Sequence, residues 1–343
     1  MTIPTGVALR LALGFIPVSL FLASLVYLDS YKLVRLRTIL QLIAMGGIAA
    51  GLSYLVNRVL FSTSVFSHHA LTIFAAPLIE EIFKATPLFL LIRAKRVGFL
   101  VDAAIFGFAI GTGFALVENV YYFWALGNTT VAGLWLVRGF GTAIMHGGST
   151  AIVGMMGKLV SGHSASSKGK SWFAIPGLLA AYGLHAMFNS FLLPPLASAV
   201  AVIVLFPPLL MFVFAQSEAY LQAWLGSGFD LDSELIESIN SGEFAQTAPG
   251  QYLQSLRQHF EGTVLADMLC LLKVHAELAL RAKGILMMRE NGFEVRRDAE
   301  IDEKLQELEY LRKSIGKTGQ LAIAPVLHST AEDVWQLRML ERA

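Results

Sequence analysis

The chain contains, at residues 100–126, the stretch LVDAAIFGFAIGTGFALVENVYYFWAL. About 20 predominantly apolar residues are enough to cross the hydrocarbon core of a bilayer as a helix. We therefore predict a membrane-spanning helix here. Gly107 and Gly111 have the GxxxG spacing that lets a second helix approach closely. The carboxylate of Glu118, deep in this apolar stretch, requires a functional or structural explanation.

Six further apolar stretches lie before residue 217, at residues 8–28, 38–57, 70–92, 132–157, 172–193 and 196–216. The first has an apolar run, Leu11 to Leu28, that is longer than that of a signal peptide, so we expect a retained span. Over the whole chain, 55% of residues are hydrophobic, 15% are charged and mean hydropathy is +0.61, which excludes a soluble globular protein. The predicted fold is all-α, a polytopic membrane bundle of about seven transmembrane helices.

Basic residues predict the orientation of this bundle. They follow the first, third and fifth spans, whereas the alternate loops carry only Arg58. By the positive-inside rule, the basic loops are cytoplasmic, the N-terminus is outside and the chain after the seventh span is inside. The basic residues in question are Lys32, Arg35, Arg37, Arg93, Lys95, Arg96, Lys158, Lys168 and Lys170.

Residues 217–343 form a second region of different character. The formal charge is +8 before residue 217 and −7 after it, which together give +1. Apolar residues at helical spacing predict a mostly helical cytoplasmic domain. Residues 264–288 are expected to form an amphipathic helix that packs in this domain or lies on the membrane face. Residues 226–232 are expected to be a linker. The negative charge disfavours nucleic acid and favours a protein partner or self-association through this tail.

Four of the predicted spans carry polar and ionisable residues that lipid disfavours. A charge at mid-bilayer costs at least about 2.5–3.5 kcal/mol, so such groups usually face the protein interior or a water-filled cavity. The residues are Glu80, Glu81 and Lys84 in the third span, Glu118 in the fourth, Arg138 and His146 in the fifth, and His185 and Asn189 in the sixth.

Spacing places several of these side chains on common faces. Positions four apart are neighbours on a helix, so we expect Glu80 over Lys84 and His185 over Asn189. At about 1.5 Å per residue, Glu80, Glu118 and His185 lie roughly 12–15 Å below the outer ends of their spans. Carboxylates, imidazoles and an amide at one depth can activate water and stabilise an oxyanion. The pattern therefore predicts a hydrolytic site.

Two of these residues have open roles. Glu81 and Lys84 form either a structural ion pair or part of the chemical site. Arg138 is expected to snorkel or to pair with a carboxylate rather than to contact substrate.

Three ordered motifs resemble those of PrsW-type intramembrane proteases, within the wider superfamily of CAAX prenyl endopeptidases and bacteriocin-processing membrane proteins. They are EExxK at residues 80–84, FxxxE at 114–118 and HxxxN at 185–189. The resemblance covers roughly residues 70–193 and implies that residues 1–216 form a protease domain. It also implies cleavage of a membrane-anchored protein in a bacterial plasma membrane, such as the first cut in an anti-sigma factor. The acidic tail lies outside the family pattern.

The resemblance implies a role for each motif residue. Glu80 and Glu118 would hold and deprotonate the water, and His185 and Asn189 would stabilise the oxyanion. The orienting and supporting residues would be Glu81, Lys84, His146 and Arg138, with His146 as proton shuttle or substrate contact.

Two alternatives remain beside this glutamic mechanism, which needs no cofactor. In the first, Glu80, Glu118, His146 and His185 hold zinc. We rank it second because the sequence lacks the pair of histidines four apart that is typical of helical zinc proteases. In the second alternative, the protein is a membrane scaffold or transporter that keeps the polar cluster for packing or ion passage.

Overall fold

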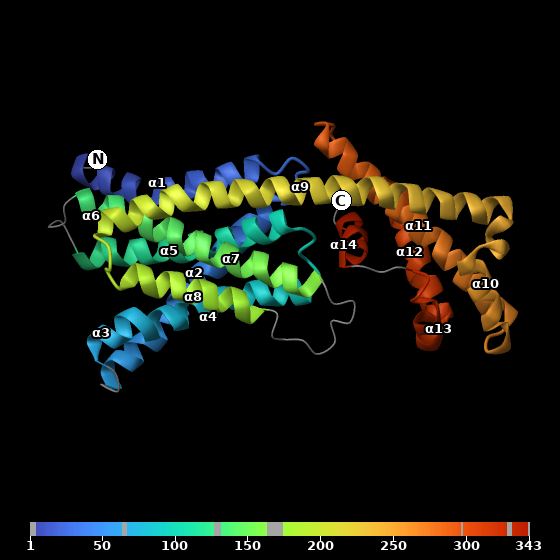
Figure 1. Ribbon diagram of the computed structural model, residues 1–343, viewed down its shortest axis with the longest axis horizontal. Coiled ribbons are helices and arrows are strands. Elements are labelled where there is room, and N and C mark those ends of the chain that lie inside the picture. The colour runs from blue at the N-terminus through green and yellow to red at the C-terminus, as the bar shows by residue number, and fades with distance from the viewer. Residues whose placement is uncertain are drawn as a thin grey trace. The chain divides into compact units, whose positions relative to one another are not determined.

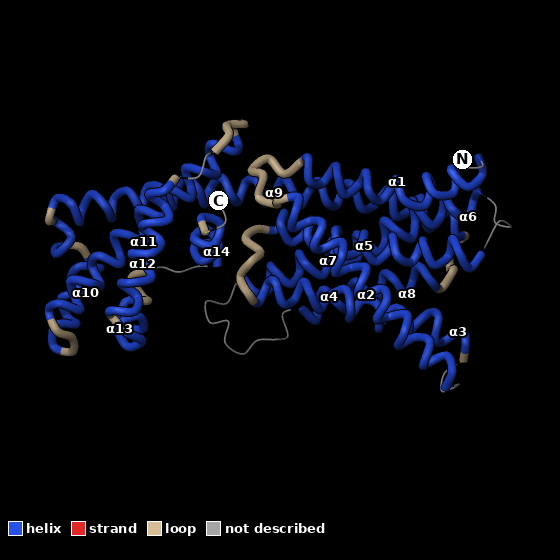
Figure 2. Tube along the Cα trace, turned by 180° about the vertical axis from the view of Figure 1, so that it is seen from behind, coloured by secondary structure: helices blue, strands red, loops and turns tan. Residues whose placement is uncertain are grey.

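The computed structural model describes residues 5–63, 67–126, 132–162, 174–295, 298–327 and 331–341. Every regular element in these ranges is a helix, as the sequence predicted (Figure 2). The chain divides into two compact units, Met1–Ser217 and Glu218–Ala343. Each unit has its own cluster of buried apolar side chains.

The first unit is a bundle whose long helices lie side by side (Figure 1). Two short π-helical segments, η1 and η3, interrupt it, each directly before a helix that carries site residues. The elements are α1 Thr5–Tyr27, α2 Leu36–Thr63, α3 His68–Ala70, η1 Leu71–Ala75, α4 Ala76–Arg93, α5 Leu100–Leu126, α6 Ala132–Leu136, η3 Val137–Thr142, α7 Ala143–Gly162 and α8 Ile175–Asn189. The first part of α9 Pro195–Ser241 belongs to the same unit.

Helix α5 is the central element of this bundle. Its residues from Val101 to Ala115 are all buried, and it packs mainly against α7 and α2. A Cβ added at Gly107 would lie 2.4 Å from the carbonyl oxygen of Thr150, and one at Gly111 would lie 2.2 Å from that of His146. These glycines allow the backbones of α5 and α7 to touch, which confirms the close packing predicted from their spacing.

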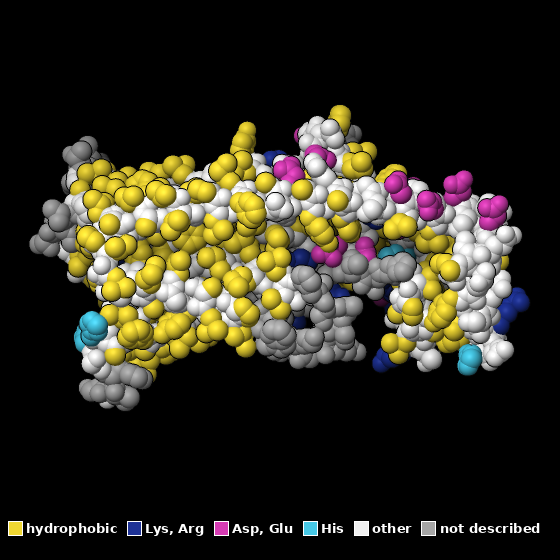
Figure 3. All heavy atoms as spheres, in the orientation of Figure 1, with side chains coloured by type: hydrophobic (Ala, Val, Ile, Leu, Met, Phe, Trp, Pro, Cys, Tyr) yellow, Lys and Arg dark blue, Asp and Glu magenta, His cyan; other side chains and the backbone are white. Residues whose placement is uncertain are grey.

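Four helices, α1, α2, α5 and α9, are long and apolar enough to cross a membrane. Hydrophobic side chains also cover much of the visible face of the first unit in Figure 3. Exposed large apolar side chains of α9 include Leu196, Leu205 and Phe212. The protein is therefore an integral membrane protein. The remaining predicted spans correspond to α4 with its charged residues, to η3 and α7, and to α8 of 15 residues. The count of seven spans and their orientation stay predictions.

The second unit is a helical cluster around α11 Gly262–Glu290. This helix confirms the one predicted at residues 264–288, and it buries Met268, Leu272 and Leu278 in the apolar core of the unit. The other elements are η5 Glu243–Gln246, α10 Ala248–Ser255, η6 Leu256–Gln258, α12 Ala299–Ser314, α13 Gly316–Ile323 and α14 Ala331–Leu340.

The predicted linker at residues 226–232 is wrong, because α9 runs through it without interruption. Tertiary contacts explain this difference. A Cβ at Gly228 would lie 2.7 Å from Cε of Lys283, so the glycine leaves room for that buried side chain. Lys283 Nζ forms an ion pair with Asp232 at 2.5 Å. Glycine and aspartate often interrupt or end helices. Here Gly228 and Asp232 instead let α9 pack against Lys283 of α11.

Candidate active site

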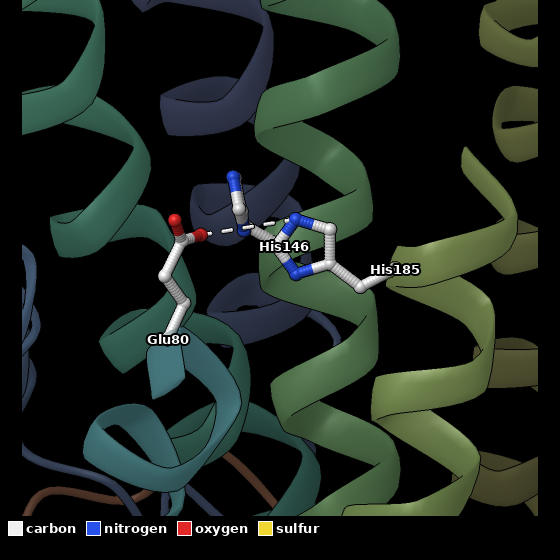
Figure 4. A group of neighbouring side chains, drawn as sticks. All are labelled: Glu80, His146 and His185. Atoms are coloured by element: carbon white, nitrogen blue, oxygen red, sulfur yellow. Dashed lines mark ion pairs between the residues drawn. The ribbon is translucent and has the colours of Figure 1, made fainter. Parts of the chain in front are cut away.

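Glu80, His146 and His185 point toward one another from α4, α7 and α8 (Figure 4). One nitrogen or oxygen atom of each lies within 4.8 Å of the others. Nε2 of His185 lies 3.7 Å from Oε2 of Glu80. The two imidazole rings meet edge to face with their centroids 4.8 Å apart. The bundle thus brings three of the predicted site residues together inside an apolar protein interior.

A fully buried ion pair lies beside this group. Nζ of Lys84 is 2.5 Å from Oε1 of Glu81, and neither side chain is exposed to solvent. The ion pair between Glu81 and Lys84, one of the two roles that the sequence left open for these residues, is therefore present. Residues three and four apart both neighbour each other on a helix. Glu81 has further donors here, because Ser149 Oγ lies 3.4 Å from Oε1 and His185 Nδ1 lies 2.7 Å from it.

These contacts fix the tautomers of both histidines. Because Nδ1 of His185 lies against the Glu81 carboxylate, Nδ1 carries the proton and the Nε2 lone pair faces Glu80. Lys84 Nζ lies 3.0 Å from Nδ1 of His146, and an ammonium group only donates. Nδ1 of His146 therefore accepts, and Nε2 donates to Oε2 of Glu118 at 3.2 Å.

A second network holds Glu118. Nη2 of Arg138 lies 3.1 Å from Oε2 of Glu118, and its guanidinium carbon lies 3.7 Å from the centroid of the Tyr122 ring. Nε of Arg138 donates to Oδ1 of Asn119 at 2.9 Å, and Nδ2 of Asn119 donates to the carbonyl of Gly14 in α1 at 2.7 Å. Arg138 pairs with a carboxylate, as the sequence predicted.

Two amide side chains complete the surroundings of the site. Asn189 donates to the carbonyl of Thr72 in η1 at 3.3 Å, so its predicted oxyanion role stays a prediction. Asn57 in α2 donates to Oε1 of Glu80 at 3.4 Å, and sequence reasoning missed it. An amide inside the otherwise apolar stretch 38–57 was the available signal.

Exposure separates the two partly exposed carboxylates from the buried charged groups beside them. The side chains of Glu80 and Glu118 are 18% and 25% exposed. His146, Glu81 and Lys84 are buried almost completely. The two reachable carboxylates can accept a proton from water, and the buried charged groups can orient the imidazoles that face them.

The three-residue group in Figure 4 also fits a metal ion by its donor set. Two imidazoles and one carboxylate are the protein ligands of many catalytic zinc sites. The contact between His185 Nδ1 and Glu81 matches the carboxylate that commonly orients a metal-bound histidine. Glu118, the fourth residue of the predicted zinc set, is not part of this group. His146 already uses both ring nitrogens, for Lys84 and for Glu118.

The π-helical segments lie next to these residues. Segment η1 ends five residues before Glu80, and η3 contains Arg138 and ends shortly before His146. Such single wide turns shift the register of the helix that follows and occur frequently at functional sites. They set the faces that α4 and α7 present to the bundle.

Comparison with known proteins gives one result at the level of families. No curated protein and no solved structure matches the chain. The sequence model described as PrsW family intramembrane metalloprotease matches residues 34–215, more than half of the chain and nearly all of the first unit. The matched region contains all the residues gathered around Glu80 and Glu118, from Asn57 to Asn189. The chain belongs to the PrsW family of intramembrane proteases.

Proposed function

We propose that the protein is an endopeptidase that cleaves a membrane-anchored protein near the outer boundary of the membrane, with Glu80 as the base that activates water. The observation that carries this proposal is the contact of Glu80 with His185. A partly exposed carboxylate that accepts from the amide of Asn57 faces an imidazole that the buried Glu81 carboxylate holds. A single-span regulator, such as an anti-sigma factor, is the substrate class that the family implies.

The reaction needs a base, a stabiliser of the oxyanion and a route for the proton. Glu80 takes a proton from water as the water oxygen bonds to the scissile carbonyl carbon. Glu80 passes this proton to Nε2 of His185, which then donates a hydrogen bond to the oxyanion, and Asn189 is the second donor. The carbon–nitrogen bond then breaks as His185 Nε2 gives the proton to the leaving amine, which leaves Glu80 ionised and His185 neutral again. Glu118, held by Arg138, places a negative charge near the site and so helps to retain the proton taken from water.

A zinc-type ion is the alternative that the family's description as metalloproteases raises. Glu80, His146 and His185 would hold it, and when bound it would acidify water and polarise the carbonyl. We prefer the glutamic mechanism because Lys84 and Glu118 occupy both nitrogens of His146. Elemental analysis of detergent-purified protein decides between them. Stoichiometric zinc that is lost in His185→Ala would overturn our preference.

The central experiment compares membrane-protein fragments in cells that express the wild type or Glu80→Gln at matched levels. Glu309→Gln is the control, because this exposed carboxylate on α12 lies in the second unit and forms an ion pair with Lys313. Fragments ending near an outer membrane boundary, present in the wild type and the control and absent in Glu80→Gln, would support proteolysis and identify the substrate. Identical profiles in all three strains under several envelope stresses would favour a scaffold or transporter.

We further propose that the protein resides in a bacterial plasma membrane with the second unit in the cytoplasm. The acidic character of residues 217–343 supports a role for this unit in binding a cytoplasmic protein or a second copy of the chain.

A further inference from the structure

Asn57 has an unusual combination of contacts. It lies in α2 and is only 9% exposed. Its Nδ2 donates to Oε1 of Glu80 at 3.4 Å, so the amide plane is anchored on the proposed base. Its Oδ1 is buried and has no hydrogen-bond partner among the residues that the structure describes. Buried side-chain acceptors are nearly always paired, because an unpaired one loses its bonds to water without replacement.

The unpaired acceptor of Asn57 is complementary to the main-chain N–H donors of a peptide substrate. In a membrane-spanning helix every main-chain N–H beyond the first turn is bonded to a carbonyl of the same helix. Hydrolysis requires a carbonyl that water can reach, so the segment around the scissile bond must unwind. Unwinding releases N–H donors in a place that offers little water, and each one needs an acceptor.

We propose that Asn57 is a substrate-binding residue whose Oδ1 accepts a hydrogen bond from a main-chain N–H of the unwound segment beside the scissile bond. This inference rests on the proposed endopeptidase function and adds a determinant of specificity to it. The amide thus binds both the proposed base and the substrate. Its Nδ2 donates to Oε1 of Glu80, whose Oε2 faces His185, and its Oδ1 accepts from the substrate.

Two consequences follow for the choice of substrate. A helical segment offers Asn57 no free N–H, so the residue selects chains that unwind locally. Proline has no main-chain N–H, so a proline at the residue that contacts Asn57 disfavours cleavage, although proline nearby promotes unwinding.

The test uses the full-length protein and synthetic fluorogenic peptides that cover the scissile bond mapped by the fragment comparison. In each peptide, one N–H flanking the scissile bond is replaced by an ester oxygen, which removes a single donor. For the wild type we expect one position at which the ester lowers kcat/KM by about tenfold, the effect of one lost hydrogen bond. In Asn57→Leu the all-amide peptide is cleaved correspondingly slowly, and the ester at that position has no further effect.

Further variants separate binding from folding. Ser53→Ala is the matched control, because Ser53 lies one turn earlier in α2, is buried and donates to the carbonyl of Ala49 in its own helix. It should keep the wild-type ester effect. Asn57→Asp keeps an acceptor and should keep discrimination between amide and ester. If size-exclusion chromatography shows that Asn57→Leu is misfolded, Asn57→Ala replaces it.

Two results would overturn the inference while leaving the proposed function intact. One is equal cleavage of all ester peptides by the wild type. The other is an ester effect of the same size in Asn57→Leu and in the wild type. No cleavage of the all-amide peptide by the wild type would instead refute the proposed function, and the role of Asn57 with it.

Discussion

Replacement of Lys84 by methionine tests the buried charge network directly. Methionine keeps the length and most of the volume of lysine, and its sulfur can still contact Phe114, whose ring centroid lies 5.1 Å from Nζ. The substitution removes the ammonium group 2.5 Å from Glu81. It leaves a carboxylate with no exposed surface, bonded only to His185 and Ser149 by the contacts described above.

The expected cost follows from the burial of this pair. Removing one partner of a buried ion pair typically lowers the free energy of unfolding by about 3–5 kcal/mol, because an uncompensated charge remains in the interior. Replacing both partners by neutral side chains of similar shape is much less costly. Lys84→Met should therefore be destabilising by about 3–5 kcal/mol, and the double variant Lys84→Met with Glu81→Gln should be more stable than the single one.

The assay is reversible unfolding in mixed micelles with increasing SDS, followed by circular dichroism. Lys313→Met is the control, since Lys313 forms an exposed pair with Glu309 on α12 and its loss should have no measurable effect. The reasoning would be refuted by equal losses of stability in Lys84→Met and in the double variant, or by additive losses in the double variant. If the double variant loses the sum of the two single losses, Lys84 and Glu81 do not stabilise each other.

Gly111→Ala should lower the free energy of unfolding by about 1–3 kcal/mol and should also lower activity, because the added Cβ would meet the carbonyl oxygen of His146 at 2.2 Å and push α7 away. Gly183→Ala is the control for SDS unfolding and cleavage, because a Cβ at Gly183 would meet nothing within 4 Å. Burial lowers the pKa of His275 to about 4, below its ordinary value of 6.5. The unfolded chain therefore binds the proton first, so the second unit should lose up to about 3 kcal/mol of stability as pH falls from 6.5 to 4, and His275→Gln should flatten this dependence in urea unfolding. Deletion of residues 226–343 should leave insertion and orientation unchanged in a cysteine-accessibility assay, because the first unit ends at Ser217 and has its own core; failure to insert would show that the second unit is needed to build the first.

Hydropathy and the cost of buried charge explain what the sequence predicts well. The long apolar helices α1, α2, α5 and α9 can be predicted without knowledge of the tertiary structure, because length and composition suffice. Glu80, Glu118, His146 and His185 were candidates because lipid disfavours them, and the structure brings them together from α4, α5, α7 and α8. Whether they are catalytic stays a prediction.

Contacts between helices are what sequence reasoning could not decide. A helix makes both Glu80 and Glu81 neighbours of Lys84, and contacts from α7 and α8 accompany the pairing with Glu81. Asn57 showed only a weak signal, since its significance depends on α4 lying beside α2. Residues 226–232 looked like a linker because the contact of Gly228 and Asp232 with Lys283 involves a helix about 50 residues later in the chain.

The hydrogen bond from Asn119 to the carbonyl of Gly14 has a consequence for biosynthesis, because these residues are 105 positions apart. The contact of His185 with Glu81 spans 104 positions. During translation, α1 and α4 therefore enter the membrane long before their partners exist. A nascent chain that has not yet released α8 lacks the imidazole that faces Glu80. The residues of the proposed site are therefore all present only after α8 has been synthesised.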